Sequence, residues 1–91
     1  MRKNLGIQIV VLQRGWVVIG RLSKFKEYYT LKDASVIRIW GTTKGLGELV
    51  KLGPQTNTKL DPTNGDVRFH ELTVVMRIKC AEQTWAKHLQ A

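Results

Sequence analysis

The chain has 91 residues, 43% of them apolar and 24% charged, which is typical of one folded domain. This composition excludes a disordered tail and a multidomain enzyme. Fifteen Lys and Arg residues against seven Asp and Glu give a net charge of +8, so we expect attraction to phosphates, nucleotides or acidic protein surfaces.

The first two expected elements form a hairpin. Residues 7–12 are β-branched and apolar, residues 13–15 resemble a tight turn, and residues 16–22 return as a second strand. Both faces of this second strand are largely apolar, which predicts a strand covered on two sides. Gly20 in its middle predicts a bend or the close approach of another backbone.

A third strand is expected over 28–40, with an interruption at 32–34. Strict alternation through the interruption would place Asp33 on the buried face, so we expect a bulge or turn there. If Ile37 and Ile39 are directed to the core, Arg38 and Trp40 share the opposite face of the strand.

Residues 41–66 are expected to be a long polar loop, which in a small domain is usually functional or an interface. Within it, residues 48–52 fit either one helical turn or a short strand. Beyond it, residues 66–70 and 72–79 are expected to be strands separated by a bulge or bend, and residues 81–90 a short terminal helix.

Several classes of site are not expected. The single cysteine, Cys80, excludes an internal disulfide and a cysteine-rich zinc site. The two histidines lack the clustered carboxylates of a metal centre, so we expect no metal and no other cofactor. No apolar run approaches the roughly 18 residues of a membrane span, and residues 1–6 lead into a strand-like segment rather than a signal peptide. We therefore expect one cytoplasmic domain over 1–91 with no membrane partner.

Short strands without a long helix fit a small antiparallel barrel or sandwich. Within this pattern the chain resembles the first signature of the Sm-like family, and the matching positions are Gly15, Gly20, Leu22, Leu31, Asp33 and Ala34. The resemblance is strongest to the short Sm-like proteins of bacterial viruses. It implies a mostly-β fold, a strongly bent antiparallel β-barrel, assembled as a ring of five or six subunits in the host cytoplasm.

Two segments depart from the family pattern. Lys26, Glu27 and Tyr28 stand where the family has an Asp and a Met-Asn pair that read RNA bases. The second signature of the family, expected near His70 and Glu71, is missing. The resemblance therefore implies the barrel and the ring more than it implies the uridine-reading pocket.

The segment 41–47 is the first candidate ligand site. Its glycines, Gly45 among them, let backbone N–H groups converge on an anion, and the hydroxyls of Thr42 and Thr43 with the ammonium of Lys44 would complete a phosphate cradle. The spacing is not that of a nucleotide-hydrolysing P-loop. The alternative is a flexible turn.

Arg38 and Trp40 are the second candidate, because a guanidinium and an indole on one face can bind a phosphate and stack on a base. The alternative is that Trp40 packs against a neighbouring subunit or the terminal helix; for Trp16 core packing is favoured. Arg14 and Lys59 would add to a positive rim once several subunits form a ring.

No Ser or Cys nucleophile has a credible base and orienting group, so we do not expect an enzyme. The favoured hypothesis is a non-enzymatic ring of Sm-like subunits that binds RNA or nucleotides through phosphate and stacking contacts. One alternative is a phage anti-defence protein that sequesters a small, cyclic or linear, nucleotide signal. Another is a structural adaptor of a virus particle.

Overall fold

The computed structural model describes residues 2–42 and 45–89. Six strands form one antiparallel sheet, which confirms the mostly-β prediction. The strands are β1 (Lys3–Leu12), β2 (Trp16–Phe25), β3 (Tyr28–Ile39), β4 (Lys59–Pro62), β5 (Val67–His70) and β6 (Val74–Lys79). The helices are α1 (Leu46–Leu52) and α2 (Glu82–Trp85), with single 3-10 turns η1 (Gln13–Gly15), η2 (Glu71–Thr73) and η3 (Ala86–His88).

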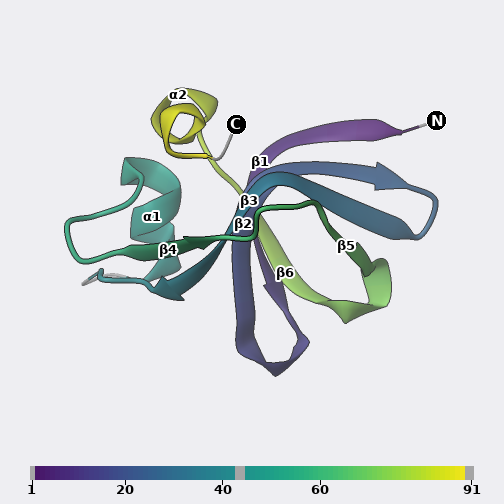
Figure 1. Cartoon of the computed structure of the whole chain (residues 1–91), viewed down its shortest axis with the longest axis horizontal. Helices are drawn as coiled ribbons and strands as arrows, with labels where there is room; N and C mark the ends of the chain where they lie inside the picture. The colour runs from purple at the N-terminus through teal and green to yellow at the C-terminus, as the bar shows by residue number, and fades with distance from the viewer. Residues whose placement is uncertain (1, 43–44, 90–91) are drawn as a thin grey trace.

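The strands follow the order β4-β3-β2-β1-β6, and β5 pairs with the first part of β3 (Figure 1). Strands β1 to β4 are therefore neighbours in chain order, whereas β5 pairs with β3 beside β4 and β6 returns to the free side of β1. This order leaves β6 at one edge of the sheet and β4 and β5 at the other. No pairing among the described residues joins the two edges.

The long strands bend sharply near their middle (Figure 1). At this point the register of β2 against β3 shifts between Ile19 and Arg21. A Cβ atom on Gly20 would lie 2.9 Å from the carbonyl oxygen of Lys32, so the two backbones approach closely here, as predicted. Asp33 has a φ of +53° and sits in the bulge, which keeps its carboxylate half-exposed and confirms the predicted interruption.

Each face of the bent sheet carries a buried core. Val17 and Ile19 of β2 belong to one core, together with Leu49 of α1 and Trp85 of α2. The residues that alternate with these along the strands, such as Val18 between Val17 and Ile19, belong to the second core on the opposite face of the sheet. Its buried members are Val10, Val18, Leu22, Tyr29, Leu31, Ala34 and Phe69. This arrangement confirms that the second strand is covered on two sides.

The prediction of a long loop over 41–66 is wrong in part, because α1 and β4 both lie within this range. Residues 48–52 belong to the helix, one of the two structures that their sequence allowed. The helix forms because Leu49 is fully buried in the first core, while Leu46 and Val50 pack against the same core.

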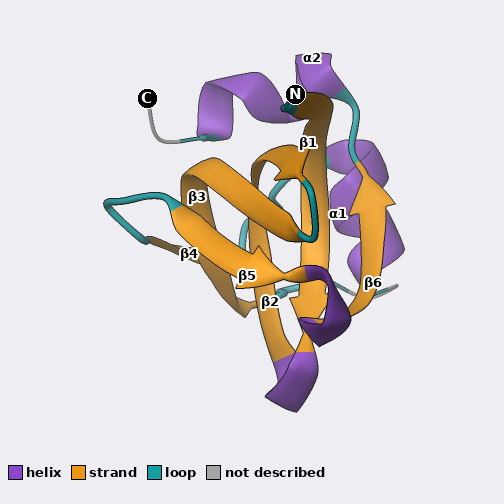
Figure 2. Cartoon of the chain, turned by 90° about the vertical axis from the view of Figure 1, so that its right-hand side faces the viewer, coloured by secondary structure: helices purple, strands orange, loops and turns teal. Residues whose placement is uncertain are grey.

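The chain ends in two short helical pieces instead of one helix over 81–90. Strand β6 is followed by α2 and then by η3, and Gln90 lies outside the described residues. Trp85 is fully buried, and its Nε1 donates a hydrogen bond of 2.8 Å to the carbonyl of Leu49. This bond ties α2 to α1. Figure 2 shows η2 between β5 and β6, where the sequence predicted a bend.

Candidate nucleic-acid interface

Two of the residues predicted to cradle a phosphate, Thr43 and Lys44, lie outside the described residues. The residues just before them are anchored to the chain that leads into β4. Gly41 has a φ of +64°, and a Cβ atom there would overlap the backbone of Asn57. The hydroxyl of Thr58 donates a 2.6 Å hydrogen bond to the carbonyl of Trp40. The hydroxyl of Thr42 is buried without a hydrogen-bond partner among the described residues.

Trp40 and Gly45 lie beside each other at the start of α1. A Cβ atom on Gly45 would be 4.0 Å from Cζ3 of the indole, and Gly45 caps the helix with a φ of +78°. The side chain of Trp40 is 41% exposed. Its ring thus partly covers the beginning of α1 and presents the rest of its surface to solvent.

Arg38 lies in a different place, a shallow pocket of about 500 Å³ that Trp16 and Val36 also line. Its Nε is 2.8 Å from Oδ2 of Asp61, so its charge already has a partner. Trp16 is 57% exposed, and the prediction that it packs in the core is wrong. It follows the hairpin turn directly and belongs to neither core.

The predicted sharing of faces at the end of β3 is also incorrect. Ile37 is buried, but Ile39 is 46% exposed. The reason is a register shift between these two residues in the pairing of β3 with β4. Arg14, with a φ of +68°, and Lys59 are both exposed. Among the described residues, Arg38 is the only predicted ligand-binding residue that lines the Trp16 pocket.

A second group of side chains, which we call the basic-aromatic face, covers the exposed part of the sheet. Its residues are Arg2, Arg21, Phe25, Tyr28, Lys32 and Arg68. The pairing places them together, since Arg21 is opposite Lys32 and Phe25 is opposite Tyr28 across β2 and β3. Residues Thr30 and Arg68 are opposite each other across β3 and β5.

The basic-aromatic face is the continuation of the face that the helices cover. Along β2, Val17 and Ile19 pack against α1 and α2, and the alternation then carries Arg21 and Phe25 onto the same side. Val18 and Leu22, at alternate positions of the strand, belong to the second core. The cations therefore emerge where the cover of the helices ends.

Aromatic rings and cations alternate at the hairpin end of this face. The guanidinium carbon of Arg68 lies 4.3 Å from the ring centroid of Tyr28, and the ring of His70 meets Tyr28 edge-on at 5.1 Å. Nζ of Lys26 is 5.5 Å from the ring of Phe25. Phe25 and Tyr28 remain 45% and 37% exposed. Both rings are thus accessible and bordered by positive charge.

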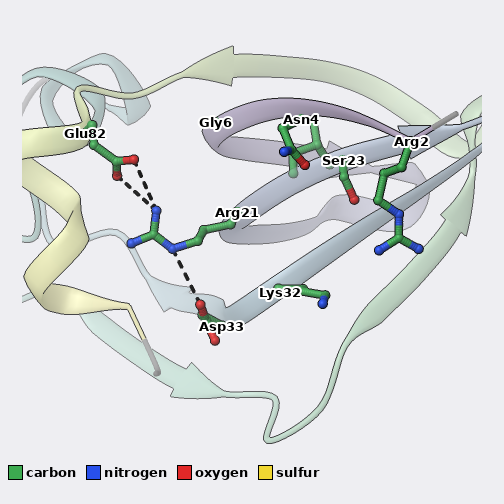
Figure 3. A pocket seen from close by; sticks show the side chains of 9 residues that line it. Arg2, Asn4, Gly6, Arg21, Ser23, Lys32, Asp33 and Glu82 are labelled. Carbon is green, nitrogen blue, oxygen red and sulfur yellow. Dashed lines mark hydrogen bonds and ion pairs between the residues drawn. The ribbon is translucent and has the colours of Figure 1, made fainter.

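Two pockets share Arg2 and run along the face. The pocket at the aromatic end has a volume of about 320 Å³ and also contains Phe25, Tyr28, Asp66 and Arg68. The pocket at the other end has a volume of about 360 Å³ and reaches from Arg2 to Glu82 at the start of α2 (Figure 3).

The cations of the face differ in whether they already have partners. Arg21 is held by Glu82 and Asp33, at 3.1 and 3.5 Å. Within the described part of the chain, Arg2, Lys32 and Arg68 take part in no ion pair. Three cations are therefore available to an anionic ligand.

One further cation near the hairpin is engaged elsewhere. Nζ of Lys24 is 2.8 Å from Oε2 of Glu71 in η2. This hydrogen bond raises the pKa of Lys24 and lowers that of Glu71. The pair joins the end of β2 to η2, and because both groups are exposed it contributes little to stability.

The basic-aromatic face could have been found from the sequence by following the alternation further. In residues 21–25 and 28–32, polar or aromatic side chains alternate with Leu22, Tyr29 and Leu31 of the second core, and Lys24 is the exception. Ending the second strand at Leu22 hid this pattern, because Ser23 to Glu27 resembles a turn. In the structure β2 continues to Phe25.

Cys80 is a free and buried thiol. Burial raises the pKa of the Cys80 thiol to about 11, so it is protonated at neutral pH. In residues 2–42 and 45–89, no group of three or more His, Cys, Asp or Glu side chains is placed to hold a metal ion. The same ranges contain no helix with the length and apolar character to cross a membrane.

No family model matches the sequence, and no curated protein matches it. The resemblance to the Sm-like family therefore rests on the sequence positions that carry it.

Proposed function

We propose that the protein is a non-enzymatic RNA-binding protein and that the basic-aromatic face is its binding surface. The observation that carries the proposal is the exposed ring of Tyr28 with the unpaired guanidinium of Arg68 stacked over it at 4.3 Å. Aromatic rings stack on unpaired bases of any sequence, while cations beside them bind the phosphates. The ligand is therefore a single strand or an unpaired loop, whose bases are free to stack.

The charge of the face supports the same ligand class. The chain carries +8 overall, and Arg2, Lys32 and Arg68 add to that field without an internal partner among the described residues. Unpaired cations in a row along a sheet neutralise successive phosphates and release their counterions. Arg38 is a weaker candidate because Asp61 already occupies its guanidinium.

We further propose that the domain is a strongly bent Sm-like barrel. The order of the strands, the sharp bend at Gly20 and the return of β6 to β1 support this architecture. Residues 26–28, which stand where the family reads bases, lie at the aromatic end of the basic-aromatic face. A base-binding position would then be kept while its chemistry changes from amide recognition to stacking.

The two sheet edges support assembly of several copies. Strand β6 is free on one side, and Leu72, Val75 and Met76 beside this edge are 78%, 63% and 49% exposed. Exposed strand edges with apolar side chains readily pair with another chain. We propose that β6 of one copy adds to β4 and β5 of the next, as the resemblance to ring-forming proteins implies.

The experiment measures the affinity for a fluorescently labelled, unstructured 10-nucleotide RNA as a function of salt concentration. We expect Tyr28→Ala and Arg68→Gln each to weaken binding about tenfold, because one loses stacking and the other a phosphate contact. Arg68→Gln should also reduce the slope of log affinity against log salt by about 1.

Two matched variants, which also remove one aromatic ring and one arginine, test the candidate site at the end of β3. Trp40→Ala and Arg38→Gln should retain the affinity of the unmodified protein. If these two weaken binding and the variants of Tyr28 and Arg68 do not, the binding surface lies at the end of β3 and the proposed face is wrong.

A further inference from the structure

The pocket at the α2 end of the basic-aromatic face contains a network that occupies one of its cations. Both carboxylate oxygens of Glu82 accept hydrogen bonds of 3.1 Å from Arg21, and Asp33 lies 3.5 Å from the same guanidinium. Figure 3 shows the three side chains directed toward one another. They tie α2 to β2 and to the bulge of β3, and together they carry one net negative charge. Arg21 is thus a positioning residue and not a free cation.

The rest of the pocket offers donors that have no acceptor. Arg2 and Lys32 form no ion pair with the described residues. Ser23 is only 7% exposed, lines the pocket and makes no side-chain hydrogen bond to a described residue. In Figure 3 its hydroxyl is directed into the pocket, on the side away from the Arg21 network, with the amide of Asn4 nearby. The Ser23 hydroxyl is not among the buried atoms without a partner, so it is open to the pocket, where a ligand or water can accept its hydrogen bond.

We propose that this pocket binds a phosphomonoester group, the terminal phosphate of a nucleic acid strand or of a free nucleotide; the inference rests on the proposed function of the face. A phosphomonoester carries close to two negative charges at neutral pH, whereas each internal phosphodiester carries one. The two unpaired cations match the dianion, and Ser23 and Asn4 supply neutral donors for its oxygens. The net negative charge of the Arg21 network repels the anion, so the phosphate is placed on the side of Arg2 and Lys32, away from Glu82.

The position of α2 explains why the phosphate would be terminal. Glu82 stands at the border between the exposed part of the sheet and the part that the helices cover. A strand lying along the basic-aromatic face from Tyr28 toward Arg21 therefore ends at the helix. Its last phosphate lies between Arg2 and Lys32.

The test compares 10-nucleotide RNAs of one sequence that carry a 5′-phosphate, a 3′-phosphate or hydroxyls at both ends. A hydroxyl-ended strand of 11 nucleotides controls for the added phosphate, because it has the same number of phosphates and all of them are diesters. Adenosine 5′-monophosphate and adenosine are measured with the same protein by calorimetry. We expect one of the phosphorylated strands to bind at least tenfold more tightly than both hydroxyl-ended strands.

Two variants locate the effect in the pocket. Ser23→Ala removes one hydroxyl and Lys32→Gln one charge, and both should reduce the preference for the phosphorylated end to less than about threefold. Lys51→Gln, which removes an exposed cation from α1, should leave the preference unchanged.

The outcomes separate the two proposals. Equal binding of the phosphorylated strands and the 11-nucleotide hydroxyl-ended strand overturns the terminal-phosphate inference and leaves RNA binding intact. Binding of adenosine 5′-monophosphate, without binding of any RNA strand or of adenosine, supports the phosphomonoester site and overturns RNA as the ligand. Failure of every RNA and of the monophosphate to bind overturns both proposals. An end preference that Ser23→Ala and Lys32→Gln leave intact overturns only the terminal-phosphate inference.

Discussion

At the scale of single residues, Gly20 shows how closely β3 passes over β2. A Cβ atom there would be 2.9 Å from the carbonyl oxygen of Lys32 and 3.1 Å from Cβ of Ala34. We expect Gly20→Ala to lower the free energy of unfolding by about 1–3 kcal/mol, because the two strands must separate to make room. Chemical denaturation monitored by circular dichroism measures this change.

Gly47 provides the matched control, because a Cβ atom there would contact nothing within 4 Å and the residue lies in α1. Gly47→Ala should raise the free energy of unfolding by about 0.5–1 kcal/mol through helix propensity alone. A destabilisation by Gly20→Ala no larger than that of an ordinary surface substitution would contradict the close approach of the strands.

The buried thiol of Cys80 gives a prediction with a defined pH dependence. Its pKa rises from 9.0 to about 11 on folding, so the thiolate fraction below pH 9 falls about 100-fold. We expect an aromatic disulfide reagent to react at pH 8 at least 100-fold more slowly with the folded protein than with the protein in urea. Equal rates would show that the thiol is accessible.

The same shift fixes the sign of the contribution of Cys80 to stability. The raised pKa makes this contribution fully present below pH 9.0, where the thiol is protonated in both states. It is lost as the pH rises from 9.0 toward about 11, because the unfolded chain ionises first. Comparison with Cys80→Ala over this range isolates the effect, since the variant lacks the titrating group.

At the scale of elements, Trp85 couples the two short helices. It is fully buried and donates a hydrogen bond to the carbonyl of Leu49. We expect Trp85→Ala to cost about 3–5 kcal/mol of unfolding free energy, and Trp85→Phe to cost less because the aromatic packing is partly kept. Trp16→Ala, at a tryptophan that is 57% exposed, is the control and should cost about 1 kcal/mol or less.

The elements that the sequence predicted best are those whose burial alternates regularly. The hairpin around 13–15, the interruption at Asp33 and the bend near Glu71 followed from period-two patterns and from the cost of burying a charge. The sequence could not decide between a helix and a strand for α1, because a segment of seven residues fits the spacing of apolar residues in either structure. Only the contact of Leu49 with the distant Trp85 settles it.

The candidate site was harder to predict than the fold for a physical reason. Cations on neighbouring strands meet only through the register, and Arg68 comes to β3 from a strand about 40 positions further along the chain. The predicted loop residues and Arg38 were chosen from local chemistry alone. The residue type alone does not show that Arg38 forms an ion pair with Asp61.

At the scale of the whole molecule, the free sheet edges predict self-association. We expect native mass spectrometry to show a closed oligomer of five or six copies and the melting temperature to rise with protein concentration. Leu72→Lys combined with Val75→Lys should shift the population to monomer, because these side chains lie exposed beside the free edge of β6.

Leu52→Lys is the control for the loss of exposed apolar surface, since Leu52 is 59% exposed and lies in α1 and not in an edge strand. It should leave the oligomer unchanged. A monomer for the unmodified protein at micromolar concentration would contradict ring assembly without affecting the proposed RNA-binding face.

The placement of the three tryptophans gives the protein built-in optical reporters. Trp85 is shielded, so its emission is blue-shifted and follows unfolding, whereas Trp16 and Trp40 are 57% and 41% exposed and open to dissolved quenchers. The basic-aromatic face contains no tryptophan. A ligand bound there leaves the quenchable emission nearly constant, and a ligand bound at Trp40 or Trp16 dims it, so the intrinsic fluorescence of the unlabelled protein distinguishes the two surfaces.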